Sequence, residues 1–128
     1  AHGRARDGGA EAVATAGISV RGWAAAPQEG TAGAGQPGTI NIVAALPVAL
    51  SDAALVNAVM TATEAKVQAL LDAGLDCSGT PTDAVCVAAR APVGEAEVHA
   101  FAGPRSEWGA RLARAVHRAV GAALPTGP

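Results

Sequence analysis

The chain has 128 residues, the size of one ordinary domain, and can bury a moderate core without disulfides. Its formal net charge is −2 and 2% of its residues are aromatic, so it has neither the positive charge that attracts phosphate backbones nor a stacking platform for bases. Nucleic acid is therefore not an expected partner. Half of the residues are apolar, mostly Ala and Val, so we expect a core of small side chains.

Neither a metal site nor a membrane span is expected. Cys77 and Cys86 lack CxxC spacing and the three histidines form no ligand-like cluster, so we expect no metal and no cofactor. The two thiols are either free or joined in a disulfide. No apolar run approaches the ~18 residues of a membrane span, and the amino terminus has no hydrophobic segment of the signal-peptide type. We therefore expect a cytoplasmic protein that binds no membrane.

The first 38 residues predict one strand between two irregular stretches. Residues 1–11, rich in Gly and Arg, predict a flexible start, and the missing initial Met suggests a fragment of a longer protein. Residues 12–20 end in β-branched side chains and predict a strand. Residues 21–38 are rich in Gly, Ala and Pro and predict a mobile loop, a lid or a linker.

A strand followed by a long helix is predicted next. In residues 39–46, "TINIVAAL", alternation puts Ile40 and Ile42 on one side and Thr39, Asn41 and Val43 on the other. The following helix is expected to have Ser51 as its N-cap and Gly74 as its C′ residue, because these are the residue types that such positions favour.

The last third of the chain predicts two more strands and a second helix. Residues 83–89 and 97–102 are expected to form a hairpin, and a helix is expected from Ser106 to about Ala123. The order β-β-α-β-β-α indicates an α+β sandwich, with two helices packed on one face of a mixed or antiparallel sheet. Residues 1–128 are expected to form a single domain.

The first helix has two residues that do not fit its pattern. At about 100° per residue, an apolar arc is formed by Leu55, Val56, Val59, Met60, Val67, Leu70 and Leu71, and Asn57, Thr61, Glu64 and Gln68 lie opposite. Thr63 and Lys66 project into the apolar arc.

Two interpretations of Thr63 and Lys66 stand side by side. In the first, Lys66 extends its ammonium to water and Thr63 bonds back to its own helix. In the second, both point into a cleft between helix and sheet, where a cation and a hydroxyl can meet a polar ligand or a developing negative charge.

Three segments of the chain form a recognisable set: "GTINIV" at 38–43, "TATEAK" at 61–66 and "GTPTDAV" at 79–85. In that order and spacing they together resemble the adenosylcobinamide amidohydrolase family (CbiZ). With "AGIS" before them and "FAGPRSEWG" before the last helix, the resemblance covers nearly all of the chain from residue 12 onward and corresponds to the carboxyl-terminal portion of longer members. It implies corrinoid salvage: adenosylcobinamide, a small-molecule corrinoid, is hydrolysed at the amide that joins aminopropanol to the corrin ring, giving adenosylcobyric acid.

Amide hydrolysis needs a nucleophile, stabilisation of an oxyanion and protonation of the leaving amine. Thr39 is the candidate nucleophile, because a small residue followed by Thr at the start of a buried strand is the arrangement of amidases that free their nucleophile by self-cleavage. The succession "GTINIV…LSDAAL…TPTDAVCVA" is distantly similar to the DmpA aminopeptidase and ornithine acetyltransferase families, which work in this way. The alternative is that Thr39 is only a β-branched residue at a strand entrance.

Lys66 is the second candidate catalytic residue, either lowering the pKa of a nucleophile or holding the oxyanion. Asp83 either satisfies backbone amides or orients Lys66 or a ligand amide. Asn41 either donates to an oxyanion or pairs with a loop, and Glu64, on the exposed side, would act only toward a partner subunit. The predicted substrate-binding residues are Asn41, Thr63, Glu64, Thr80, Thr82 and Asp83.

A non-catalytic function is the competing hypothesis. A small, Ala- and Val-rich α+β unit could form a homo-oligomer that holds a ligand between subunits, as a ligand-binding or shell-type module. Lys66 and Asp83 would then be ion-pair partners across the interface.

Overall fold

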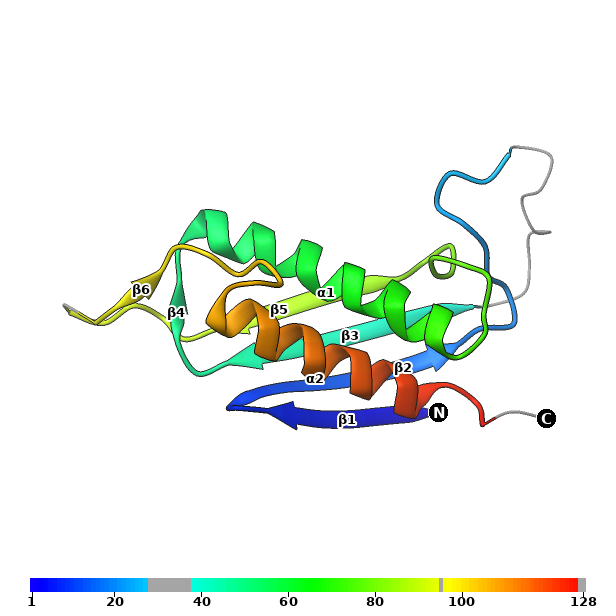
Figure 1. The fold of residues 1–128 in the computed structure, drawn as a ribbon, viewed down its shortest axis with the longest axis horizontal. Helices are drawn as coiled ribbons and strands as arrows, with labels where there is room; N and C mark the ends of the chain where they lie inside the picture. Colours follow the sequence, from blue (N-terminus) through cyan, green and yellow to red (C-terminus); the bar gives the residue numbers. More distant parts are fainter. Residues whose placement is uncertain (28–37, 95, 127–128) are drawn as a thin grey trace.

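The structure is a computed structural model that describes residues 1–27, 38–94 and 96–126 (Figure 1). Over these residues the elements are, in chain order, β1 (His2–Asp7), β2 (Ala10–Gly17), β3 (Thr39–Leu46), β4 (Ala49–Leu50), α1 (Asp52–Asp72), β5 (Ala84–Ala89), β6 (Val98–His99) and α2 (Glu107–Ala123).

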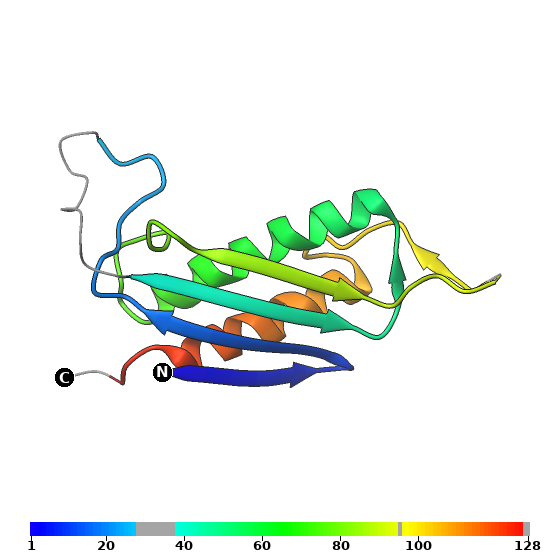
Figure 2. The same cartoon turned by 180° about the vertical axis from the view of Figure 1, so that it is seen from behind.

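The main sheet is mixed and both helices cover the same face of it. Its order is β1-β2-β3-β5, with antiparallel pairs on either side of β2 and a parallel pair between β3 and β5. Parallel neighbours require a crossover connection, which α1 supplies. Figures 1 and 2 show α1 and α2 side by side on one face and the opposite face bare of helices. The predicted α+β fold, with two helices on one face of a mixed sheet, is confirmed.

The prediction of a flexible start at residues 1–11 is wrong. Strand β1 pairs with β2 from His2↔Thr15 to Asp7↔Ala10. Gly8 and Gly9 close the hairpin with φ of 53° and 100°, and a two-residue turn with both φ values positive matches the twist of paired strands. In the sequence, the Gly8-Gly9 pair indicates such a turn. The alternation of apolar and polar residues that would indicate the two strands is weak, because many of the flanking residues are Gly or Ala.

The predicted hairpin between residues 83–89 and 97–102 is also wrong. Strand β5 pairs with β3, and the two-residue β6 pairs in parallel with β4 in a separate small sheet. The chain after β5 returns to the start of α1, where the Ser51 amide donates to the His99 carbonyl at 2.9 Å. This contact anchors the return segment beside the amino end of α1.

Both predicted ends of α1 are confirmed. The Ser51 side chain accepts a hydrogen bond from the Ala54 amide at 3.1 Å and so caps the amino end. At the carboxyl end Gly74 has φ 80°, its amide donates to Leu71, and the Leu75 amide donates to Leu70. These two bonds form a Schellman motif, which needs the left-handed conformation that Gly adopts at no steric cost.

The predicted buried face of α1 is wrong. Val56 and Met60, placed in the apolar arc, are 66% and 56% exposed, whereas Thr61, placed on the polar side, is 1% exposed and donates to the Ala102 carbonyl at 2.7 Å. The buried residues are Ala54, Ala58, Thr61, Ala62, Ala65, Lys66, Ala69 and Leu70. Because α1 packs against the sheet and α2, small side chains take the contact face and several larger apolar ones remain outside.

The core consists of small side chains, as the composition predicts. Ile40, Ile42, Leu70 and Leu112 are among its largest members, and alanines from both helices and the sheet fill much of the rest. Helix α2 lies so close to β1 that a Cβ at Gly3 would be 2.1 Å from the Ala119 carbonyl oxygen.

The bare face of the sheet carries a row of paired apolar residues. Val13 pairs with Val43 and Val43 with Cys86 in adjacent strands, and Val13 and Val43 are 42% and 54% exposed. Cys86 is exposed and Cys77 is buried, and both thiols are free.

Candidate functional site

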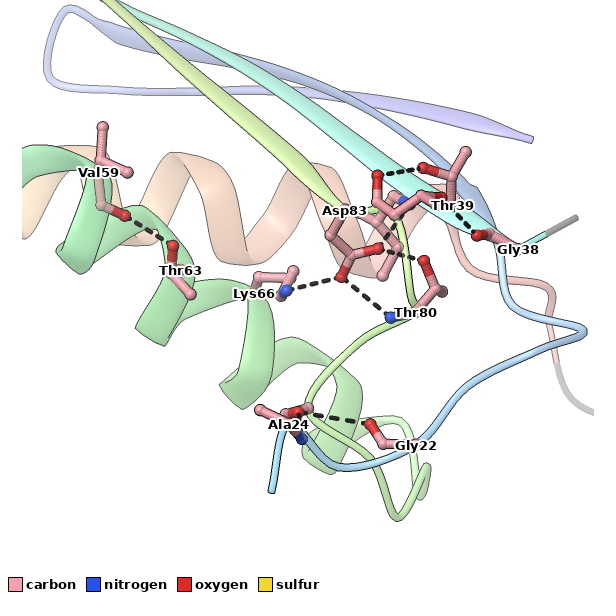
Figure 3. A network of polar contacts seen from close by, with 12 residues as sticks. Gly22, Ala24, Gly38, Thr39, Val59, Thr63, Lys66, Thr80 and Asp83 are labelled. Atoms are coloured by element: carbon pink, nitrogen blue, oxygen red, sulfur yellow. Dashed lines mark hydrogen bonds and ion pairs between the residues drawn. The ribbon is translucent and has the colours of Figure 1, made fainter. Parts of the chain in front are cut away.

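A buried ion pair joins α1 to the segment that leads into β5. Nζ of Lys66 lies 2.7 Å from Oδ2 of Asp83, and the two side chains are 9% and 11% exposed (Figure 3). The interpretation in which Lys66 extends its ammonium to water is therefore wrong. The ammonium lies between helix and sheet, where water screens it little.

Asp83 is held by four donors. Besides Lys66, the amide of Ile40 donates to Oδ1 at 2.9 Å, the amide of Thr80 donates to Oδ2 at 3.1 Å, and the Thr80 hydroxyl donates to Oδ1. Burial raises the pKa of Asp83, but the bonds from Lys66, Thr80 and Ile40 outweigh it, so the pKa lies below 3.8. Asp83 is thus an anion at neutral pH and a weak base.

Lys66 retains donor capacity. An ammonium has three N–H donors, and within the described part of the chain Asp83 is the one partner that its nitrogen bonds. Lys66 also lines a pocket. Two of its N–H groups are therefore available to a ligand oxygen.

Gly79 leaves the space that the ion pair needs. A Cβ at this position would lie 2.1 Å from Oδ2 of Asp83 and 2.8 Å from Nζ of Lys66. Distances this short are steric clashes, so any side chain at residue 79 would displace the pair.

The pocket beside the ion pair has a volume of about 530 Å³. Residues 20–26, called the strap below, form one side of it, and the loop before β5 forms the other. The lining residues are Val20, Arg21, Gly22, Trp23, Ala24, Ala26, Lys66, Ser78, Gly79, Thr80, Pro81 and Asp83. A pocket lined by two cationic residues, Lys66 and Arg21, and by a mixture of polar and apolar walls is a suitable site for a small polar molecule.

Hydrogen bonds fix the strap to the loop before β5. The Gly22 amide donates to the Gly79 carbonyl at 3.0 Å, the Ser78 amide donates to the Gly22 carbonyl at 3.0 Å, and the Ala24 amide donates to the Ser78 hydroxyl at 2.8 Å. Within the predicted mobile loop, the backbone of residues 22–24 is thus held by hydrogen bonds to the loop before β5. The rest of that prediction, from 28 to 37, lies outside the described residues.

Known proteins are similar to this chain over almost all of its length. Residues 1–127 match the sequence model of the family described as adenosylcobinamide amidohydrolase (CbiZ). The chain belongs to this family. Its relatives include the adenosylcobinamide amidohydrolase of Methanosarcina mazei, 40% identical over 93 residues that make up 68% of this chain and 46% of the relative.

A second relative, the adenosylcobinamide amidohydrolase of Halobacterium salinarum, is 42% identical over 126 residues, which are 94% of this chain and 52% of the relative. The chain thus spans about half the length of the curated relatives it matches. No solved structure matches it significantly.

The hydroxyls of Thr39 and Thr82 join the start of β3 to the segment just before β5. The Thr39 hydroxyl donates to the Thr82 carbonyl at 2.9 Å, and the Thr82 hydroxyl donates to the Gly38 carbonyl at 2.9 Å (Figure 3). Neither threonine is among the pocket-lining residues. The partner of the Thr39 proton is a backbone carbonyl, which is not a base.

Three further predicted substrate-binding residues, besides Thr82, are not among the pocket-lining residues. Asn41 is exposed on the bare face of the sheet, with Nδ2 3.5 Å from the Thr15 hydroxyl, because strand alternation turns it away from the helices. Asn41 therefore lies on the opposite face of the sheet from α1 and Lys66. The Thr63 hydroxyl donates to the Val59 carbonyl of its own helix at 2.8 Å, and Glu64 is exposed.

The sequence interpretation missed the strap as a pocket wall. Irregular segments rich in Gly and Ala carry no periodicity, so nothing in residues 20–26 predicted their contact with a loop more than 50 residues away. The usable signal was Trp23, a large aromatic residue inside a Gly- and Ala-rich stretch of a chain with few aromatics.

Residues 1–27, 38–94 and 96–126 contain no group of three or more His, Cys, Asp and Glu side chains that could hold a metal ion. Over the same residues neither helix has the length and apolar character needed to cross a bilayer.

Proposed function

We propose that this chain carries the amide-hydrolysing site of a corrinoid-salvage enzyme. The substrate is adenosylcobinamide, the bond cleaved is the amide that joins aminopropanol to the corrin ring, and the product is adenosylcobyric acid. Membership of a family whose relatives are named for this activity supports the reaction. The observation that carries the site is the buried Lys66–Asp83 pair at the pocket wall.

Lys66 is proposed to stabilise the oxyanion. Attack on an amide carbonyl produces a tetrahedral intermediate whose oxygen becomes negative, and fixed donors around that oxygen lower the barrier. The two N–H groups of Lys66 that Asp83 leaves unused provide such donors. Because the ammonium is already oriented and largely shielded from water, little reorganisation is needed when the charge develops.

Asp83 is proposed to position Lys66. Its lowered pKa makes it a poor general base, and its four donors hold the carboxylate in one place. Since Asp83 also bonds Ile40 and Thr80, it ties the ammonium to the start of the sheet.

Thr39 stays the predicted nucleophile. In self-cleavage its Oγ1 attacks the Gly38 carbonyl carbon, an ester replaces the peptide bond, and the hydroxyl proton passes to the Thr39 nitrogen. Water then hydrolyses the ester to a Gly38 carboxylate and a free Thr39 hydroxyl and amine. The Thr82 hydroxyl already bonds the Gly38 carbonyl oxygen, which would carry the negative charge in this step, and so supports the hypothesis.

The nucleophile is tested by intact-mass analysis of the freshly purified protein and of Thr39→Ala. We expect the wild-type chain to be cut between Gly38 and Thr39 and the variant to be uncut and inactive. A single uncut species that still hydrolyses substrate after Thr39→Ala would rule the nucleophile out. Thr15→Ala, which removes the hydroxyl of an exposed threonine in β2, is the control and is expected to leave cleavage and activity unchanged.

The reaction is tested by incubation with adenosylcobinamide and chromatography for adenosylcobyric acid. We expect Lys66→Met, which keeps the length of the side chain and removes its charge, to lower kcat by about 100-fold or more. Gln68→Met makes a similar change at an exposed position of the same helix and is expected to leave kcat unchanged. Equal product formation by Lys66→Met and wild type would contradict the role of Lys66.

A non-catalytic, homo-oligomeric binding module is the second candidate. The exposed apolar row at Val13 and Val43 favours it, since such a surface suits a partner. Its premise of an ion pair between subunits has no support, because Lys66 and Asp83 pair within one chain. Sedimentation of Lys66→Ala separates the hypotheses: the enzyme requires lost hydrolysis with an unchanged assembly. A cytoplasmic location is proposed for either function.

A further inference from the structure

Trp23 is the aromatic residue of the pocket. The chain has one Phe, two Trp and no Tyr, all of which the structure describes. Phe101 and Trp108 are not among the pocket-lining residues, whereas Trp23 is. In a chain so poor in aromatic rings, the presence of one at the pocket wall needs a reason.

The indole is fixed in place before any ligand binds. Its Nε1 donates to Oδ1 of Asp76 at 2.9 Å. The residues on either side are also held, since the Gly22 amide bonds Gly79 and the Ala24 amide bonds Ser78. The ring is therefore attached to the same loop that leads to Asp83, so its position relative to the Lys66 ammonium is set by hydrogen bonds.

The ring remains available for contact. Trp23 is 43% exposed although its one polar atom is already bonded. What it still presents to the pocket is apolar π surface, which gains free energy by stacking on another flat ring and by leaving water.

We propose that Trp23 is the stacking surface for a flat conjugated ring of the corrinoid ligand. This inference rests on the proposed function, because that function makes the ligand a corrinoid. Adenosylcobinamide has two conjugated ring systems, the adenine of its adenosyl group and the corrin macrocycle, and both offer the same chemistry to an indole. Lys66 then meets the polar part of the ligand while Trp23 holds an apolar part.

Equilibrium dialysis with the product and an analogue of it, both of which lack the scissile amide, tests this inference without turnover. The probes are adenosylcobyric acid and cobyric acid without the adenosyl group. We expect Trp23→Leu to raise Kd for adenosylcobyric acid roughly 5- to 100-fold, the range that follows from removing one stacked aromatic ring. Phe101→Leu removes a 75% exposed aromatic residue outside the pocket and is expected to leave Kd unchanged.

The two probes distinguish the two rings. Weaker binding of adenosylcobyric acid alone identifies adenine as the ring on Trp23, and equal weakening of both probes identifies the corrin. An unchanged Kd for both probes in Trp23→Leu overturns the inference and leaves the proposed function standing. If the wild-type protein binds neither probe, both the inference and the proposed function fail.

Trp23→Phe distinguishes stacking on the ligand from a purely structural role of the hydrogen bond between Trp23 and Asp76. Phenylalanine keeps a ring and loses the bond to Asp76, so stacking predicts a Kd within a few-fold of wild type. Asp76→Ala removes the acceptor of the indole N–H. If Trp23→Phe and Asp76→Ala weaken binding as much as Trp23→Leu does, the hydrogen bond and not the ring is what matters, and the inference is wrong.

Discussion

Lys66 and Asp83 lie 17 positions apart in the chain, yet their charged groups meet at 2.7 Å between helix and sheet. A pair this deeply buried stabilises a fold only if its remaining hydrogen-bonding capacity is satisfied. Asp83 meets that condition with backbone and hydroxyl donors, whereas Lys66 does not. Both residues line the pocket, and among the described residues Lys66 is the partner with N–H donors left for a ligand.

Neutralising Asp83 is expected to destabilise the protein. Asp83→Asn keeps the side-chain shape and weakens the charge-assisted bond from Lys66, which leaves a buried ammonium without an anion. We expect the free energy of unfolding to fall by about 2 kcal/mol. Urea denaturation measures this, with Glu64→Gln on the exposed side of α1 expected to lie within about 0.5 kcal/mol of wild type. Equal midpoints for wild type and Asp83→Asn would show that the pair contributes nothing.

A single methyl group at residue 79 is expected to break the site. Gly79→Ala places a carbon 2.1 Å from Asp83 Oδ2, so the carboxylate must move and hydrolysis of adenosylcobinamide should be lost together with stability. Gly121→Ala is the matched control, because a Cβ there meets nothing within 4 Å and Gly121 lies in α2. Alanine in a helix is expected to raise its stability by up to about 1 kcal/mol. Normal activity in Gly79→Ala would show that the ion pair is not needed.

Acid is expected to destabilise the wild-type protein through Asp83. Its pKa is lowered in the folded state and close to its ordinary value of about 3.9 in the unfolded chain. The stability it contributes is therefore fully present above that value and is lost as the pH falls through the folded-state pKa. Urea unfolding between pH 7 and lower pH should show this loss in the wild type.

The same titration in Asp83→Asn should be flatter, because the substituted amide does not titrate. Asp7 supplies a second, separate component, since its hydrogen bond with Arg114, helped by Arg118, also lowers its pKa. Asp7→Asn should remove that component alone. Identical pH profiles for wild type and Asp83→Asn would mean that the Asp83 pKa does not change on folding.

The buried hydroxyl of α1 is expected to matter more than the half-buried one. Thr61→Val leaves the Ala102 carbonyl buried without its donor, so we expect a loss of about 2 kcal/mol in unfolding free energy. Thr63→Val removes a hydroxyl that bonds only within its own helix, and a change within about 0.5 kcal/mol is expected. The reverse order in a thermal melt would contradict the buried face described for α1.

The elements that sequence predicted well are those whose signal is local. Alternation in β3 and the capping residues Ser51 and Gly74 depend only on neighbours in the chain, and the structure agrees with them. Which face of α1 is buried depends instead on how closely the sheet and α2 approach the helix. A prediction from hydrophobicity alone therefore placed the wrong face of α1 in the core. Lys66 was identified because it interrupted an apolar pattern, although its partner is known only from the fold.

The small buried residues of α1 determine how far the Lys66 ammonium lies from Asp83. Ala62, Ala65 and Ala69 are buried, and their short side chains let α1 lie close to the elements it packs against, so that the Lys66 side chain ends on Asp83. A larger residue at any of these positions would displace the helix and move the ammonium away from Asp83. The position of the Lys66 ammonium thus depends on neighbouring residues of the helix that make no contact with a ligand and contribute only their small size.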